Sequence, residues 1–95
     1  MSTAPSSDPS SLAAAAHQDR AAHERVALSL ARQGMMNHLG VRLLSATVGQ
    51  VELSVPYSDK VTQQQGGFHG GAIGALADIA AGYAALTVSP EGMEV

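Results

Sequence analysis

The stretch that decides the fold reads Gln63-Gln64-Gln65-Gly66-Gly67-Phe68-His69-Gly70-Gly71-Ala72 and is followed closely by Leu76-Ala77-Asp78. Polar and glycine-rich residues end within it, and a nearly uninterrupted run of small apolar residues begins. This run predicts one long helix over about 71–87, after a polar loop that spans 58–71. Asp78 is the one carboxylate inside the helix, and a charge among apolar residues is costly unless it is paired or used.

The N-terminal part of the chain predicts a tail and then a helix. Residues 1–10 are rich in Ser and Pro and are expected to be disordered, and 1–16 as a whole forms a disordered or weakly helical tail. An amphipathic helix follows, because apolar residues recur at four-residue spacing: Ala22, Val26 and Leu30. Gly34 suits a left-handed cap at its end, and 35–40 would connect it to strands.

Alternating apolar and polar residues predict a β-hairpin next. Its strands are expected at about 41–48 and 51–57. The two residues between them, Gly49-Gln50, suit a type II′ turn because the loop begins with glycine. Residues 93–95 would start another strand. Helices combined with antiparallel strands predict an α+β fold.

Composition excludes several classes of function. The net charge is −3 and no Lys or Arg follows Lys60, so this half offers no basic surface to nucleic acid. The chain has no cysteine, and no cluster of His, Asp and Glu has ligand spacing, so we expect no metal and no cofactor. The N-terminus lacks the pattern of a secretory signal. Residues 72–88 are short for a membrane span and include one acidic residue, so we expect a buried helix there. We expect a cytoplasmic protein without membrane or nucleic-acid partners.

One face of the predicted long helix is nearly free of side-chain bulk. It carries Gly74, Asp78, Ala81, Gly82 and Ala85. Another backbone or a ligand can approach such a face closely. Because a chain of 95 residues builds only a small core, assembly with a partner or a second copy is expected on size alone.

The start of the helix and Asp78 offer complementary chemistry. Gly70 and Gly71 fall in the first turn, where backbone N–H groups lack an internal partner and suit an oxyanion. Gln63 could add an amide donor, and Asp78 could act as nucleophile or general base. Gly70 and Asp78 are about 12 Å apart along the helix axis, too far to act on one carbonyl. Two antiparallel copies of the helix would bring Gly70 of one to Asp78 of the other.

These residues also resemble a known family, the hotdog-fold acyl-CoA thioesterases of the phenylacetic acid degradation type. The segments that carry the resemblance are Gln63, His69-Gly70-Gly71, Ala77-Asp78, Ala81-Gly82-Tyr83-Ala84-Ala85, Leu39-Gly40-Val41 and Gly49-Gln50-Val51-Glu52-Leu53. The match covers about 35–95. It implies a long helix wrapped by a curved antiparallel sheet, an acyl-CoA substrate, and a homodimer or homotetramer.

The resemblance also implies roles for single residues. Asp78 takes the place of the catalytic acid on the helix, Gly70 that of the backbone oxyanion donor, and Gln63 that of a loop residue beside the thioester. Three neighbours would contact substrate: His69, Gly71 and Gly82. Residues 17–95 would form the N-terminal part of the domain, with an N-terminal helix, a hairpin and the central helix, because the sequence ends where the family's third strand begins.

Simpler interpretations stay open beside these. His69 near a helix start is more often a structural hydrogen-bonding residue than a catalyst, and the glycines fit a helix-packing motif. Asp78 could be a structural carboxylate. The chain could then be a non-catalytic module that binds acyl-CoA or dimerises, or an inactive fragment. A hotdog dehydratase fits less well, because no His–acid pair is evident on the helix.

Overall fold

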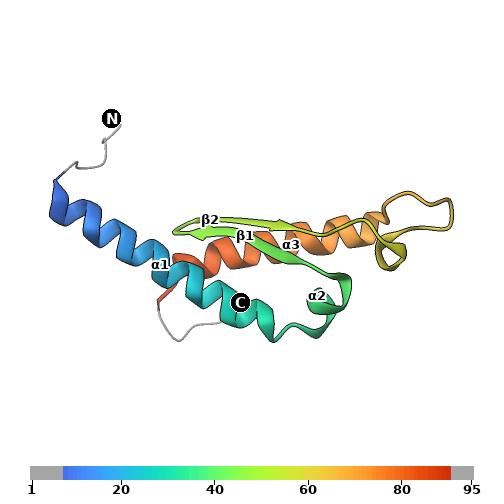
Figure 1. Ribbon diagram of the computed structural model, residues 1–95, viewed down its shortest axis with the longest axis horizontal. Helices are drawn as coiled ribbons and strands as arrows, with labels where there is room; N and C mark the ends of the chain where they lie inside the picture. Colours follow the sequence, from blue (N-terminus) through green and yellow to red (C-terminus); the bar gives the residue numbers. More distant parts are fainter. Residues whose placement is uncertain (1–7, 91–95) are drawn as a thin grey trace.

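The computed structural model describes residues 8–90, so the strand expected over 93–95 lies outside the described residues. In chain order the elements are α1 (Pro9–Ala31), α2 (Gly34–Leu39), β1 (Arg42–Thr47), β2 (Gln50–Ser54), the 3₁₀ turn η1 (Asp59–Val61) and α3 (Gly70–Thr87). α1 packs against β1, α3 packs against β2, and the two helices also contact each other (Figure 1). The predicted α+β class and the order helix, hairpin, long helix are confirmed.

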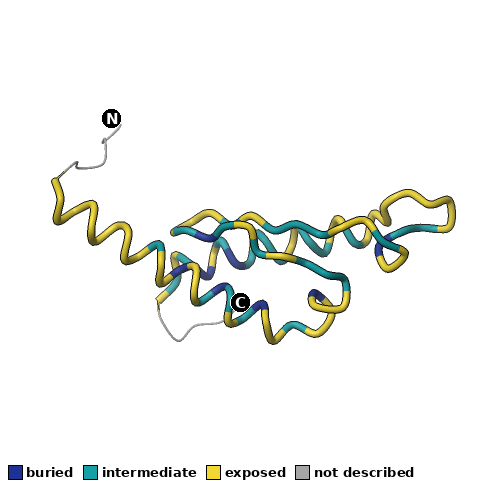
Figure 2. Tube along the Cα trace, in the orientation of Figure 1, coloured by how far each residue is buried: buried dark blue, intermediate teal, exposed yellow. Residues whose placement is uncertain are grey.

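α1 begins earlier than the predicted tail allows. Asp8 caps it, accepting hydrogen bonds from the backbone N–H of Ser10 (3.3 Å) and from its hydroxyl (2.7 Å), and Pro9 occupies the first turn, where proline is favoured. Hydrogen bonds from Ser10 lower the pKa of the Asp8 carboxyl. The structure places residues 9–16 in the first turns of α1. This half of α1 is exposed and projects beyond the hairpin (Figures 1 and 2).

The end of α1 also differs from the prediction. α1 stops at Ala31 with Arg32 as a right-handed cap, and Gly34 begins α2 rather than ending α1. The left-handed cap falls instead at Gly40, which has φ 80° and ends α2. Residues 34–39 are thus a short helix and not an irregular connection. The left-handed cap thus falls one glycine later than predicted, because Gly34 takes a helical conformation as the first residue of α2.

The β-hairpin forms close to its predicted limits. Thr47 pairs with Gln50, so the turn residues are Val48 and Gly49 and not Gly49-Gln50. Only the second of them has positive φ (Gly49, 80°), whereas a type II′ turn needs it at the first, so that prediction was wrong. A bulge at Leu44 interrupts the register between Leu43 and Ser45. β2 ends at Ser54, short of the predicted limit at 57 and before Pro56, which has no N–H to donate to a ladder.

The core lies where α1, the hairpin and the second half of α3 meet. Its buried residues are Val26, Leu30, Met36, Ala46, Tyr83 and Leu86. Val26 and Leu30 come from the predicted apolar face of α1, and Ala22 on the same face is also buried. Two of these side chains, Tyr83 and Leu86, are the only buried residues of α3. The core therefore fixes the C-terminal half of α3 and leaves its start outside.

α3 runs from Gly70 to Thr87, within one residue of its predicted limits. By length and composition it is the one helix among residues 8–90 that could cross a membrane, a test that core helices of soluble proteins also pass. The sequence favoured a buried helix, but most of α3 is exposed or half-buried in this chain. Its small-residue face is open: Gly74, Asp78, Ala81 and Ala85 are exposed and Gly82 is half-buried.

Candidate active site

The N-terminus of α3 is capped by the side chain of His69. Its Nδ1 accepts a hydrogen bond of 2.8 Å from the backbone N–H of Gly71. A Cβ added at Gly71 would lie 2.9 Å from both Nδ1 and Cε1 of that ring, so glycine is needed for the cap. The structural interpretation of His69 is thus supported. Gly71, with its N–H used in this way, is not available as a donor to a substrate.

Gly70 keeps the free donor at this helix end. It occupies the first helical position, and within residues 8–90 its backbone N–H has no hydrogen-bond acceptor. A Cβ added here would meet no atom within 4 Å, which leaves room for a group to approach. Both the orphan N–H and the helix dipole favour a negatively charged oxygen at this point. Gly70 therefore has the geometry expected of an oxyanion donor.

Gln63 belongs to a narrow loop over residues 62–68, and the segment between β2 and α3 loops out at this same end of α3 (Figure 1). The loop closes on itself, because Gln63 N–H donates to the Gly67 carbonyl at 2.8 Å and Gly66 N–H donates to the Gln63 carbonyl at 2.9 Å. The side-chain Oε1 of Gln63 accepts from the backbone N–H of Gln65. Since the amide oxygen is used within the loop, the group of Gln63 that has no hydrogen-bond partner among residues 8–90 is its NH₂ donor. This suits a carbonyl oxygen better than it suits a water proton.

Asp78 is exposed, contrary to its expected burial among apolar residues, and forms no hydrogen bond or ion pair with any residue of 8–90. It borders a cavity of about 470 Å³ between α1 and α3. The lining residues are Ser29, Gln33, Asp78, Ile79, Ala81, Gly82 and Tyr83. An unpaired carboxylate at the edge of an open cavity is free to take a proton or to meet a substrate.

A chain of polar groups forms one wall of this cavity. Gln33 Nε2 donates to the Tyr83 hydroxyl at 2.6 Å, and that hydroxyl donates to Ser29 Oγ at 3.0 Å. Tyr83 is buried, so its hydroxyl needs these partners. No sequence pattern predicts this wall, because Ser29 and Gln33 lie about fifty residues from Tyr83 along the chain and no local period connects them.

The predicted site residues fall into two groups. One group, at the start of α3, consists of Gln63, His69, Gly70 and Gly71. The other, Asp78 and Gly82, borders the cavity further along the helix. Because α3 is continuous from Gly70 to Thr87, the predicted spacing of about 12 Å between Gly70 and Asp78 applies. One copy of the chain cannot place both groups on a single carbonyl.

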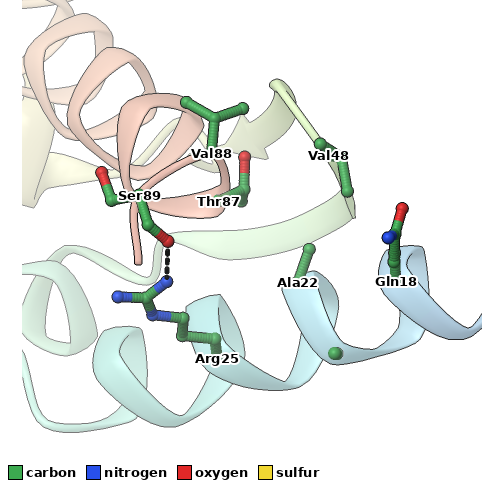
Figure 3. Close-up of a pocket in the computed structure, with 8 residues that line it drawn as sticks. Gln18, Ala22, Arg25, Val48, Thr87, Val88 and Ser89 are labelled. Atoms are coloured by element: carbon green, nitrogen blue, oxygen red, sulfur yellow. Dashed lines mark hydrogen bonds between the residues drawn. The ribbon is translucent and has the colours of Figure 1, made fainter. Parts of the chain in front are cut away.

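Two other cavities have none of these predicted site residues in their lining. One, of about 470 Å³, lies at the C-terminal end of α3 beside Arg25 (Figure 3). Arg25 donates to the carbonyls of Leu86 and Ser89 at 2.9 Å each and also to that of Pro90, so its guanidinium caps α3. A groove of about 410 Å³ between the hairpin and α3 is mostly apolar, lined for example by Leu53 and Ile73. Among residues 8–90, no group of three His, Cys, Asp or Glu residues could hold a metal ion.

Comparison with known proteins gives two relatives. The chain is 41% identical to a thioesterase family protein from Silicibacter pomeroyi of known crystal structure, with a TM-score of 0.69 over 72% of this chain and 50% of that one. It is also 34% identical over 61 residues to a Halobacterium salinarum protein named "Putative esterase". This alignment covers 61% of this chain and 40% of that protein. No protein-family model matches the chain.

These similarities bear on the fold and on the general chemistry. The structural match and the observed hairpin and long helix confirm the hotdog prediction for the part of the fold that this chain contains. Both relatives carry esterase or thioesterase names, so the resemblance to thioesterases holds at that general level. The chain spans 50% of the structural relative and 40% of the curated one.

Proposed function

We propose that the protein hydrolyses acyl-CoA thioesters, with Gly70 and Gln63 as donors to the carbonyl oxygen and Asp78 as the catalytic carboxylate. The observation that carries this proposal is that one helix bears two polar groups without a hydrogen-bond partner among residues 8–90. Gly70 has a free N–H at the start of α3, and Asp78 lies unpaired at a cavity edge eight residues later. The 41% identity to a thioesterase family protein supports the reaction class.

The reaction needs two copies of the chain. A donor and a base must both reach within about 3 Å of the reacting atoms, and the spacing on one helix is about 12 Å. The open face around Asp78, with Ala81 and Ala85 exposed, leaves room for a second α3 to pack antiparallel. We therefore propose a homodimer, or a homotetramer built from such dimers, in which each site combines Gly70 of one copy with Asp78 of the other.

Catalysis in this site depends on stabilising the negative charge that develops on the thioester carbonyl oxygen. The Gly70 N–H and the Gln63 amide polarise the thioester carbonyl and hold the oxyanion that forms when the carbon becomes tetrahedral. In one route Asp78 takes a proton from water, and the water oxygen attacks the carbonyl carbon. In the other route the Asp78 carboxylate attacks the carbon itself and forms an anhydride, which water then cleaves. The C–S bond breaks, and the CoA thiolate leaves and is protonated to the thiol. His69 and Gly71 act by shaping the helix start, and Gly82 by leaving space in the cavity wall.

The finer substrate assignment is also part of the proposal. The His69-Gly70-Gly71 turn and the Ala77-Asp78 pair support the phenylacetic acid degradation type within the thioesterases. A CoA substrate supports a cytoplasmic location, and we propose no metal and no further cofactor. Neither nucleic acid nor membrane is proposed as a partner.

Thiol release tests the proposal directly. The protein is mixed with phenylacetyl-CoA, and free CoA is measured with a thiol reagent. We expect Asp78→Asn to lower turnover by roughly 10²-fold or more, as expected for loss of a general base. Because Asp78 is exposed and unpaired among residues 8–90, the free energy of unfolding of the Asp78→Asn protein should differ from that of the parent by no more than about 0.5 kcal/mol. Equal turnover by a folded Asp78→Asn variant would exclude Asp78 from the reaction.

The same assay separates the enzyme from the non-catalytic module. A module would bind phenylacetyl-CoA, as measured by calorimetry, without any release of thiol. An enzyme releases thiol in proportion to its concentration and loses that activity with Asp78→Asn.

A further inference from the structure

Tyr57 contacts the loop that carries the proposed oxyanion donors, although it is not one of the proposed site residues. Its hydroxyl donates a hydrogen bond of 2.5 Å to the carbonyl of Gly66, at the tip of the loop. Its ring also packs edge-on against Phe68, with ring centroids 5.6 Å apart and an interplanar angle of 67°. One side chain thus contacts both the tip and the returning arm of the loop.

The loop has few other attachments. Its base is closed by a hydrogen bond of 2.7 Å from His69 N–H to the carbonyl of the buried Val61, and by a β-bridge between Thr62 and Phe68. Residues 64–69 are all exposed. Among the described residues, Tyr57 is the only one outside the loop that donates a hydrogen bond to its tip. The position of the loop therefore depends strongly on this contact.

The two arms of the loop carry the two proposed donors. Gln63 lies on the outgoing arm, and the returning arm leads through Phe68 and His69 directly to Gly70. Both donors must point to one oxygen, and small errors in their relative position weaken stabilisation of the transition state. Gln63 is hydrogen-bonded to Gly66 and Gly67, so a residue that fixes the tip and the returning arm also fixes Gln63. Such a residue therefore acts on the rate of the chemical step.

We propose that Tyr57 is a positioning residue of the oxyanion hole: it holds the loop over residues 62–68 so that Gln63 and Gly70 act on the same carbonyl oxygen. This inference rests on the proposed thioesterase function. Tyr57 itself touches no substrate in this scheme. We expect its effect on kcat, because the two donors bind the oxyanion of the transition state more strongly than the carbonyl of the bound substrate.

Two variants separate the hydroxyl from the ring. Tyr57→Phe keeps the ring contact to Phe68 and loses the hydrogen bond to Gly66, and we expect kcat to fall about threefold to tenfold. Tyr57→Leu loses both contacts, and we expect a fall of roughly 10- to 100-fold, in the range that small misplacements of catalytic groups cause. In both variants KM for phenylacetyl-CoA should change by less than about twofold. The graded effect distinguishes positioning from general loss of fold.

The matched control is Leu28→Ala on α1. Leu28 and Tyr57 are each 62% exposed, but only Tyr57 contacts the loop. We expect the control to keep wild-type kcat and KM. Thermal melts should give similar midpoints for all the variants, because neither residue belongs to the buried core.

Hydrogen exchange gives a readout that does not depend on activity. The amides of Gln63 and Gly66 are bonded within the loop, so their exchange reports how often the loop opens. We expect exchange about tenfold faster in Tyr57→Leu and a smaller increase in Tyr57→Phe, with the amides of α1 unchanged. If the parent protein is active and Tyr57→Leu has the same kcat, the positioning role is overturned. Unchanged exchange at the amides of Gln63 and Gly66 in Tyr57→Leu overturns it as well. Parent protein that releases no thiol overturns the proposed function instead, so the two failures are distinguishable.

Discussion

Replacing Gly70 by proline removes the proposed oxyanion donor with little expected damage to the fold. Proline has no N–H, and the Gly70 N–H makes no hydrogen bond within residues 8–90. Gly70 is the first residue of α3, the helix position at which proline is favoured. The preceding residue, His69, has φ −71° and ψ 126°, within the extended region that proline requires before it.

The size of the effect can be worked from these features. A Cβ at position 70 meets no atom within 4 Å, and restricting the unfolded chain should stabilise the protein by about 0.4–1 kcal/mol. Loss of one oxyanion donor typically lowers kcat by about 10²–10³, or roughly 2.7–4 kcal/mol of transition-state stabilisation. Gly70→Pro should therefore be at least as stable as the parent and far less active.

The assay is thiol release from phenylacetyl-CoA, with circular dichroism melts of the same preparations. Gly70→Ala is the matched control, because it adds a side chain in the same open space but keeps the N–H. We expect it to retain most of the activity. A Gly70→Pro protein that folds normally and turns over within about threefold of the parent would show that this N–H does not stabilise the oxyanion.

Two further predictions concern the ends of α3. Gly71→Ala brings a Cβ to 2.9 Å from the His69 ring and disrupts the cap, so the gain of about 0.4–1 kcal/mol usual for Gly→Ala is offset by a cap loss of about 1 kcal/mol. A Cβ added at Gly34 meets no neighbour within 4 Å, so Gly34→Ala should keep the full gain in the free energy of unfolding, measured by urea denaturation. Equal stabilisation by Gly34→Ala and Gly71→Ala would contradict the role of the cap. Arg25→Met removes the hydrogen bonds to three carbonyls at the end of α3 and should destabilise by about 2 kcal/mol. Arg20→Met on the exposed face of α1 should cost less than about 0.5 kcal/mol, and an equal loss in both variants would refute capping by Arg25.

Local patterns were enough to predict the principal elements of this fold. The apolar alternation of the hairpin and the small-residue run of α3 each depend on residues close together in sequence, so their limits fell within a few residues of the structure. The errors occurred where two local signals competed. Gly34 and Gly40 are both candidates for a left-handed cap, and only the second adopts it, after a short helix whose Met36 packs into the core.

The candidate site was predictable in part. The motif from Gln63 to Asp78 singled out the residues, and helical rise gave their spacing. The use of Gly71 N–H by His69, the exposure of Asp78 and the contact of Tyr57 with the loop were not predictable. Each depends on a side-chain direction or on a contact between segments, and a single sequence does not encode these in any local period.

The central claim is that two copies share each site, and subunit mixing tests it most directly. Gly70→Pro and Asp78→Asn proteins, each nearly inactive alone, are mixed in equal amounts under conditions that let subunits exchange. Half of the dimers should then be mixed, and one of their two sites joins an intact Gly70 to an intact Asp78. The account predicts recovery to about a quarter of parent activity for random pairing in a two-fold dimer. Activity no greater than the average of the two separate variants, with exchange verified by a tagged subunit, would contradict it.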